Sequence, residues 1–295
     1  MQSFLSTIDK HPVIWFLCLL PVLLSCSSLQ NGSAQGPTIP LSKTFEASAE
    51  AIKFNKPQGF LPFKKHNQQL SNYVVSEAHR RTRTEKTELT DVREKRNSLL
   101  KELIFDSDPL FLVEEYEISG STKFGFSLGD KVATKWRSEC EAFTKDNASL
   151  KVTNQERNTG VIRSRRSFSD RLETFLACSI ISDNENWQLI IKPDENGTMN
   201  FALTSGEKSY AVRATTDLYE LVEGKNGPER RSLPPWVSGT SGVEIFSSNE
   251  QLSALPFVGE PIMWVKENLP PNKKELLLAV NYSLSMFDWF DDNWR

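Results

Sequence analysis

The sequence predicts a mainly β protein of the α+β class, an antiparallel β-sandwich or barrel of about a dozen short strands. A helical segment precedes these strands and an apolar C-terminal helix follows them. Three observations support this fold: short β-like runs follow Asp108, turn residues separate nearly all of them, and apolar residues recur at helical spacing near the end of the chain. Short strands at this spacing are typical of antiparallel sheets rather than of alternating parallel folds.

The clearest hairpin joins residues 188–191 to residues 199–203. Between them lies Pro-Asp-Glu-Asn-Gly, whose Asn196-Gly197 pair favours a tight turn. The other predicted strands share short apolar runs and cover 111–118, 124–128, 132–143, 149–154, 174–181, 210–214, 217–222, 242–247, 251–257 and 261–266. We therefore expect residues 108–295 to form a β-rich globular domain that includes the C-terminal helix.

Residues 45–107 are predicted to be a helical, charged segment. A short helix fits within 45–54, and a longer one fits over about 88–104, where Leu89 and Val92 begin a stripe of apolar residues near one helical face.

Residues 276–290 are predicted to form the C-terminal helix. A proline pair ends the preceding strand, and Asn272 with Glu275 has the form of a capping box at a helix start. The segment is apolar almost all round, so the helix must be buried on every side. A strand is the alternative, because apolar residues also alternate over 280–286, but the length of the segment favours a helix.

The stretch Pro261-Ile-Met-Trp-Val-Lys-Glu-Asn-Leu-Pro270 passes from a strand into a turn, and residues 275–290 follow it as the apolar segment. This ending resembles the tubby and phospholipid-scramblase superfamily. The resemblance implies a twelve-stranded barrel that encloses a hydrophobic C-terminal helix. No phosphoinositide-binding or calcium motif of that group can be placed on this sequence, so no functional residue is carried over.

The N-terminal stretch predicts a membrane anchor. Residues 12–26 form an apolar run that is too short to cross a hydrocarbon core of roughly 30 Å and is typical of a signal peptide. The run ends in Leu-Leu-Ser-Cys26, which resembles the lipobox of bacterial lipoproteins. The resemblance implies that the peptide bond before Cys26 is cut, that Cys26 is linked to diacylglycerol, and that the new amine is usually acylated. An ordinary cleaved signal peptide is the alternative.

This interpretation divides the N-terminal part of the chain. Residues 1–25 are the lipoprotein signal peptide, and residues 26–44 are a flexible tether, because Ser, Gly, Gln and Pro cannot bury enough surface to order themselves. Ser27 follows the cysteine, which by the same resemblance implies a lipid-anchored protein of the bacterial cell envelope, at the outer membrane.

Cys140 and Cys178 are the cysteines that remain after the anchor. If both lie on strands, alternation turns both side chains toward the core, and an oxidising compartment favours a disulfide between them. Two separate buried thiols are the alternative.

Two basic clusters stand out in the sequence. The first contains Arg80, Arg81 and Arg83, and the second contains Arg163, Arg165 and Arg166. One interpretation is contact with lipid phosphates or anionic glycan at a membrane surface. The other is that they are solvated faces, because acidic residues are interleaved with them.

Several function classes are disfavoured. A net charge of −3 argues against nucleic acid as a partner. No histidine follows residue 80, and no phosphate loop or zinc motif is present, so we expect no cofactor, no metal and no enzyme. We expect a non-enzymatic binding or structural module with an unknown protein or glycan partner. The alternatives are a periplasmic lipid carrier and a carboxylate-based hydrolase.

Overall fold

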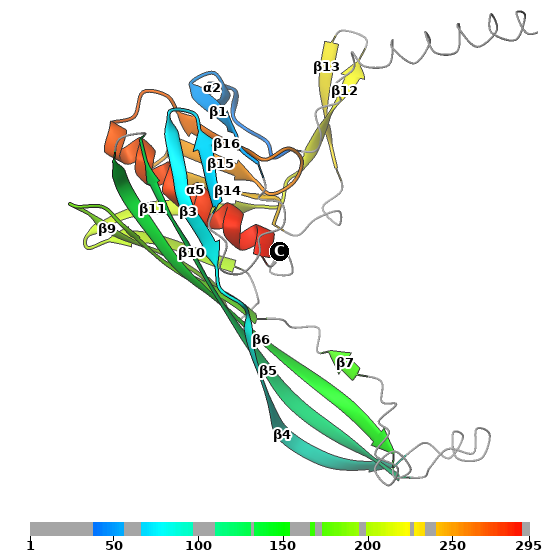
Figure 1. Ribbon diagram of the computed structural model, residues 1–295. Helices are drawn as coiled ribbons and strands as arrows, with labels where there is room; N and C mark the ends of the chain where they lie inside the picture. Colours follow the sequence, from blue (N-terminus) through cyan, green and yellow to red (C-terminus); the bar gives the residue numbers. More distant parts are fainter. Residues whose placement is uncertain are drawn as a thin grey trace, which may run out of the picture.

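A computed structural model describes residues 38–55, 66–96, 110–130, 133–153, 166–168, 173–194, 199–224, 227–233 and 240–290. Their fold is mainly β: a nearly closed antiparallel sheet follows a path of 12 strands, and a C-terminal helix packs against it (Figure 1). The predicted fold class is therefore confirmed, including the apolar C-terminal helix.

The strands in chain order are β1 (Ala49–Lys53), β2 (His66–Leu70), β3 (Tyr73–Arg80), β4 (Thr84–Arg96), β5 (Leu110–Gly129), β6 (Thr134–Thr153), β7 (Arg166–Phe168), β8 (Glu173–Ile181), β9 (Asn186–Pro193), β10 (Met199–Ser205), β11 (Lys208–Thr215), β12 (Tyr219–Gly224), β13 (Gly227–Ser232), β14 (Gly242–Ser247), β15 (Glu250–Pro256) and β16 (Ile262–Lys266). The sheet order is β1-β16-β15-β14-β11-β10-β9-β8-β6-β5-β3-β2, with β4 paired to β5 and β7 paired to β6. Strands β12 and β13 form a separate hairpin. The hairpin predicted around the Asn-Gly pair is confirmed as β9 and β10, which pair from Met199 opposite Pro193.

Helix α5 (Pro271–Phe290) fills the inside of the sheet. Every residue from 275 to 288 is buried, and the helix contacts strands from both parts of the sheet path, β5, β6 and β8 as well as β15 and β16. A helix that is apolar on all sides needs this burial on all sides. Residues 280–286 are therefore helical, and the strand alternative is wrong.

The same helix ties together the two ends of the sheet path. The Lys274 ammonium lies 2.6 Å from the Glu50 carboxylate on β1, and the Tyr282 hydroxyl donates to the Gln68 side chain on β2 at 3.3 Å. Ser71, in the turn after β2, also donates to Glu50 at 2.7 Å. The hydrogen bond from Lys274 holds the pKa of Glu50 below its ordinary value. These contacts bring β1 and β2 together, which nearly closes the sheet.

The predicted capping box does not form. The helix begins at Pro271, where a proline fits because the first helical amide needs no acceptor. Glu275 instead turns toward β6, where it accepts from the Lys135 ammonium at 2.9 Å and from the Trp136 indole at 3.3 Å. The glutamate at this position thus attaches the helix to the sheet.

The prediction of a helical segment over residues 45–107 is wrong for its described part. Helix α2 (Lys43–Glu46) is a single turn followed by β1, and β4 occupies the start of the expected 88–104 helix. A register shift between Leu89 and Asp91 makes Thr90 an extra residue in β4. The bulge brings Leu89 and Val92 to one face although they are three positions apart, which imitates helical spacing. The rest of that helix lies outside the described residues.

Two predicted boundaries also change. Ile39 and Leu41 are buried and Thr38 bridges to Tyr219, so the described end of the expected tether is packed against the body. Strands β1 to β4 belong to the same sheet as the later strands, so the β-rich domain begins before residue 108. The histidines His66 and His79 therefore lie within the sheet.

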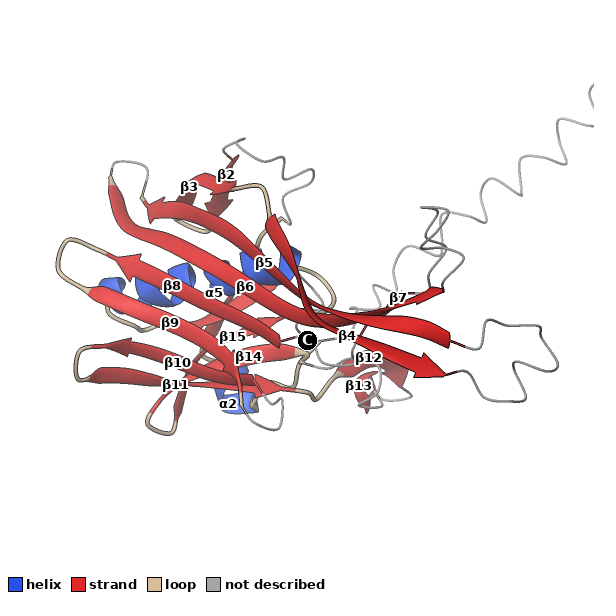
Figure 2. Cartoon of the chain, turned by 90° about the horizontal axis from the view of Figure 1, so that it is seen from below, coloured by secondary structure: helices blue, strands red, loops and turns tan. Residues whose placement is uncertain are grey.

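Strands β5 and β6 are longer than predicted. Each has 20 residues, and they pair continuously from Phe111 opposite Thr153 to Phe124 opposite Cys140 and beyond. The polar stretch around Gly120 resembles a turn in the sequence, but Gly120 leaves space for the Arg83 guanidinium to cross the strand. We call the part of the sheet that runs beyond the barrel-like body the arm; it consists of β4, residues 110–121, residues 144–153 and β7 (Figures 1 and 2).

One residue of α5 supplies a stability prediction. Asn281 is fully buried, and neither polar atom of its side chain has a hydrogen-bond partner among the described residues. Asn281→Leu is expected to raise the free energy of unfolding by about 1–2 kcal/mol, because it removes a buried unsatisfied amide and keeps a similar volume. Urea unfolding of the two proteins measures this, and a lower midpoint for the variant would show that the amide has a stabilising contact.

Candidate functional site

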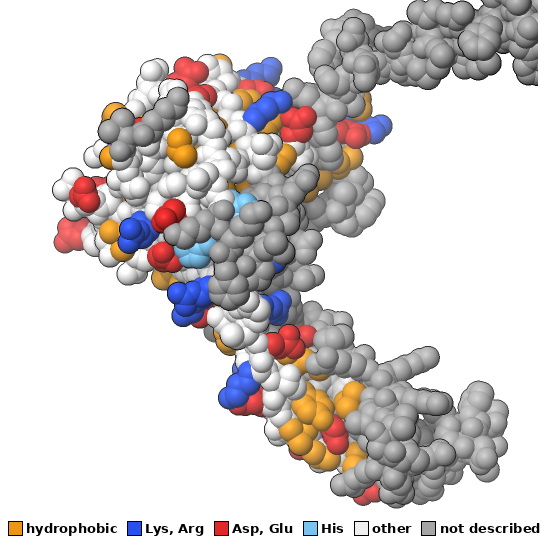
Figure 3. All heavy atoms as spheres, viewed as in Figure 1, with side chains coloured by type: hydrophobic (Ala, Val, Ile, Leu, Met, Phe, Trp, Pro, Cys, Tyr) orange, Lys and Arg blue, Asp and Glu red, His pale blue; other side chains and the backbone are white. Residues whose placement is uncertain are grey.

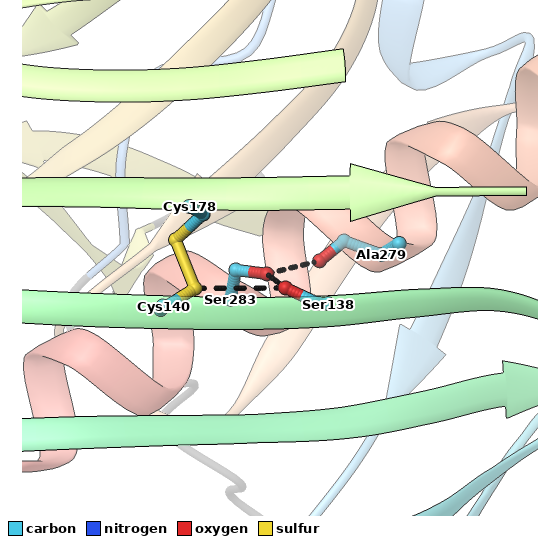
Figure 4. The surroundings of a disulfide bond; sticks show 5 residues. All are labelled: Ser138, Cys140, Cys178, Ala279 and Ser283. Atoms are coloured by element: carbon cyan, nitrogen blue, oxygen red, sulfur yellow. Dashed lines mark hydrogen bonds between the residues drawn. A yellow bond between two sulfur atoms is a disulfide. The ribbon is translucent and has the colours of Figure 1, made fainter. Parts of the chain in front are cut away.

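The predicted disulfide is confirmed. Cys140 on β6 and Cys178 on β8 are directly opposite each other in the sheet, with a Cα–Cα distance of 4.0 Å and a sulfur–sulfur bond. Both side chains point toward the helix (Figure 4). Beside them, the Ser283 hydroxyl of α5 donates to the Ala279 carbonyl at 2.8 Å, so the Ser138 hydroxyl donates to Ser283, also at 2.8 Å. The disulfide thus lies where β6, β8 and α5 meet.

A depression of about 550 Å³ lies on the outer face of the sheet over this disulfide. We call it the outer-face depression. Five strands or their ends supply its lining: His79, Arg81, Lys123, Glu139, Cys140, Glu141, Ala177, Cys178, Ser179, Gln188 and Ile190. The two cysteines form part of its floor, so a covalent bond and the helix behind it fix the spacing of the strands there.

The depression carries charges of both signs. Lys123 and Glu141 pair at 3.2 Å, and the Ser121 hydroxyl donates to Glu141 at 2.6 Å. The bond from Ser121, followed by that from Lys123, lowers the pKa of the Glu141 carboxyl, so it stays ionised at neutral pH. The Arg81 and Glu139 side chains are exposed beside this pair.

A glycine lies between two of the residues that line the depression. Gly125 stands between His79 on β3 and Glu139 on β6 in the register of the three strands. A Cβ atom on Gly125 would lie 2.7 Å from the Glu139 carboxylate and 2.7 Å from the Ser138 carbonyl, which is closer than carbon atoms approach. The carboxylate therefore extends over β5 toward the His79 side, and the His79 Nδ1 atom lies 2.9 Å from the Glu77 carbonyl oxygen.

The structure separates the three arginines of the first basic cluster. Arg81 lines the outer-face depression. Arg80 is half-buried opposite Phe124, which faces the core. The Arg83 guanidinium donates to the Thr144 hydroxyl at 2.8 Å, where the arm joins the body. The cluster is therefore not one continuous basic surface.

The other predicted site residues are placed only in part. Cys26, Arg163 and Arg165 lie outside the described residues, and Arg166 begins β7 opposite Leu150. Sequence analysis missed Gly125, Glu139 and Gln188. A glycine within a strand, which often marks close approach of another group, was the one available signal.

Comparisons with models of protein families, with curated proteins and with solved structures each find no match. In the described part of the chain, no helix is long and apolar enough to cross a membrane. The same residues contain no group of three or more side chains placed to hold a metal ion.

Removing the disulfide should loosen the floor of the depression. The bond closes a sequence separation of 38 residues, and loop-closure entropy in the unfolded chain makes such a bond worth about 4 kcal/mol. A variant with Cys140→Ser and Cys178→Ser is expected to lose stability of this order in urea unfolding. A peptide map of the unreduced protein should link the two strands, and two freely alkylated thiols would contradict the bond.

Proposed function

We propose that this chain is a lipid-anchored protein of the bacterial envelope that acts as a non-enzymatic binding module and holds a segment of a protein partner in the outer-face depression. The lipobox-like ending at Cys26 supports the anchor, and Ser27 supports transport to the outer membrane. The nearly closed sheet around a C-terminal helix fits the architecture of the tubby and scramblase superfamily, which supports that resemblance at the level of fold alone.

The binding proposal rests on exposed charges of both signs, on a sheet surface that the disulfide and α5 hold in place from behind. Arg81 and Lys123 stand beside Glu139 and Glu141, and Ile190 adds an exposed apolar surface. A peptide offers carboxylate, ammonium and aliphatic groups to match all three, whereas a neutral glycan leaves the charges without partners. Complementary charges of this kind fix the orientation of a protein partner and exclude wrong ones.

Two alternative functions receive less support. Lipid carriage needs an apolar space inside the sheet, and α5 occupies the centre with residues 275–288 buried. A carboxylate-based hydrolase needs one carboxylic acid with a raised pKa, and within the outer-face depression the pKa of Glu141 is lowered instead. Burial does raise the pKa of the Glu244 carboxyl, but Glu244 lies on β14, outside this depression. The oxidised Cys140 also offers no thiol for nucleophilic chemistry.

Site-specific photo-crosslinking in envelope membranes of bacteria that produce the full chain tests this proposal. A photoreactive residue in place of Gln188, at the edge of the depression, is expected to give a discrete adduct. The matched control has the same residue in place of Ala211, an exposed position on β11, and is expected to give no such adduct. Arg81→Glu in the Gln188 variant should reduce the adduct at least tenfold.

The nature of the adduct separates the alternatives. A mass that protease removes supports a protein partner, and a mass that only a glycan-degrading enzyme removes contradicts it in favour of a glycan. Equal adducts from both positions, or an adduct that Arg81→Glu leaves unchanged, would show that the depression is not the binding surface.

A further inference from the structure

Among the described strands, the outermost strand of the arm is paired along one edge only. Strand β4 has 13 residues, and within the described part of the chain it pairs with β5 alone. Its other edge presents a row of backbone amide and carbonyl groups. Such an edge pairs readily with another strand unless something covers it.

One face of the arm is also rich in apolar side chains, although Glu94, Glu114 and Asp146 share it. Residues opposite each other in an antiparallel sheet share a face, and the register therefore collects Leu89, Val92, Leu112, Tyr116, Ile118, Ala148 and Leu150 on one side. Leu89 is 53% exposed and Val92 is 46% exposed, which makes them the most exposed of this set. Figure 3 shows hydrophobic side chains gathered on the arm.

The opposite face of the arm is polar and carries ion pairs. Within β4, Lys86 pairs with Glu88 and Arg93 pairs with Asp91, and Arg93 also reaches Glu115 on β5 at 3.4 Å. Along the polar face of β4 the charges follow the order Lys86, Glu88, Asp91, Arg93 and Lys95, with two negative charges between the positive ones. An antiparallel second copy can therefore place a negative charge of one strand opposite a positive charge of the other.

We propose that two copies of this chain join edge to edge through β4, antiparallel, about a twofold axis between Thr90 and Asp91. This register sets Leu89 of one copy opposite Val92 of the second copy, so the two exposed apolar side chains of each copy cover one another. It also places the bulge at Thr90 of one copy beside the bulge of the second copy, so that Leu89 and Val92 of both copies stay on the same face of the joined sheet. The two arms then form one continuous sheet.

Charge complementarity favours this register. Glu88 of one copy is opposite Arg93 of the second copy, and the pairs within each strand extend this contact into a chain of alternating charges from Lys86 to Asp91 of the second copy. One kind of like-charge contact remains, between Lys86 and Lys95 of the second copy, and the twofold axis repeats it. A shift by two residues toward the start of the strand would instead oppose Lys86 to Arg93, Glu88 to Asp91 and Glu85 to Glu94, which are three like-charge contacts. A shift by two residues toward its end would put Leu89 opposite Glu94 and Val92 opposite Asp91, so the exposed apolar side chains would no longer cover each other. Like charges directly opposite on a sheet destabilise the pairing.

The register is tested by disulfide trapping in the full chain. Two chains, one with Leu89→Cys and one with Val92→Cys, are produced together and extracted with mild detergent. The mixture is expected to give a covalent dimer between the two different chains, since these positions are opposite. Each variant alone should give at least tenfold less, because identical positions lie three residues apart along the paired strands. No trapped dimer from the mixture, or equal trapping by each variant alone, would overturn the proposal.

Charge variants test the same pairing without new cysteines. Glu88→Arg and Arg93→Glu are each expected to weaken the dimer at least tenfold in analytical ultracentrifugation, and the double variant should recover most of the loss. Lys95→Glu should strengthen the dimer several-fold, because it replaces the remaining like-charge contact. Urea midpoints close to that of the unchanged chain show that the fold is retained. A monomeric full chain, or a dimer unaffected by all of these changes, would contradict the pairing.

Discussion

Leu277→Asp is expected to unfold the protein or to leave it with a small fraction of its stability. Leu277 is fully buried near the start of α5. The change removes a large apolar side chain, which costs about 2–5 kcal/mol, and places a carboxylate at a fully buried position in the hydrophobic core. Burying an unpaired charge costs several kcal/mol more or forces the group to stay protonated, against a typical total stability of 5–15 kcal/mol. Urea unfolding followed by circular dichroism measures the loss.

Asn272→Asp is the matched control for this variant. Asn272 lies in the exposed first turn of the same helix, where a negative charge suits the helix dipole. We expect a change in the free energy of unfolding of at most about 0.5 kcal/mol there. Similar small losses for both variants would mean that the helix does not occupy the interior of the sheet.

Cys26→Ala is expected to release the protein from the membrane fraction. Under the lipobox interpretation the cysteine sulfur carries the diacylglycerol, and two or three acyl chains give stable anchoring, which the variant lacks. Labelled fatty acid should enter the unchanged protein and should not enter the variant. Fractionation of cells that produce each form measures both effects.

Cys18→Ala is the control for the anchor, because Cys18 lies inside the apolar run rather than at its end. This variant should remain in the membrane fraction and take up label. If the Cys26 variant also stays bound and the unchanged protein takes up no label, the chain has no lipid on Cys26.

The parts of the fold that depend on local sequence could be predicted. The β9–β10 hairpin follows from the Asn-Gly pair and its flanking apolar runs, and α5 follows from an apolar pattern too long for a strand. Cys140 and Cys178 could be paired because alternation and compartment agreed.

The parts of the fold that depend on contacts between distant segments could not be predicted from the sequence. Strand β1 is short and consists mostly of Ala, Glu and Lys, which are depleted in strands, and it pairs with β16 more than 200 positions later in the chain. In β4 the bulge at Thr90 gives Leu89 and Val92 a helical spacing. A bulge is defined by the register with the partner strand, so the sequence of β4 alone does not reveal it.

The candidate site is non-local for the same reason. Residues of β3, β5, β6, β8 and β9 surround the outer-face depression, and only the sheet order brings His79 near Glu139. The basic cluster in the sequence included Arg81, which does line the depression, but grouped it with Arg80 and Arg83. Strand alternation turns Arg80 to the face of Phe124, and Arg83 binds Thr144 where the arm begins.

Amide hydrogen exchange of the full chain tests most directly the claim that the helix fills the sheet and leaves the outer surface for binding. The amides of residues 276–287 should exchange as slowly as those at the centres of β6 and β8, because the helix can leave only when the whole body unfolds. Fast exchange of the helix while β6 and β8 remain protected would contradict this account, since it would show an interior that opens and can hold a ligand.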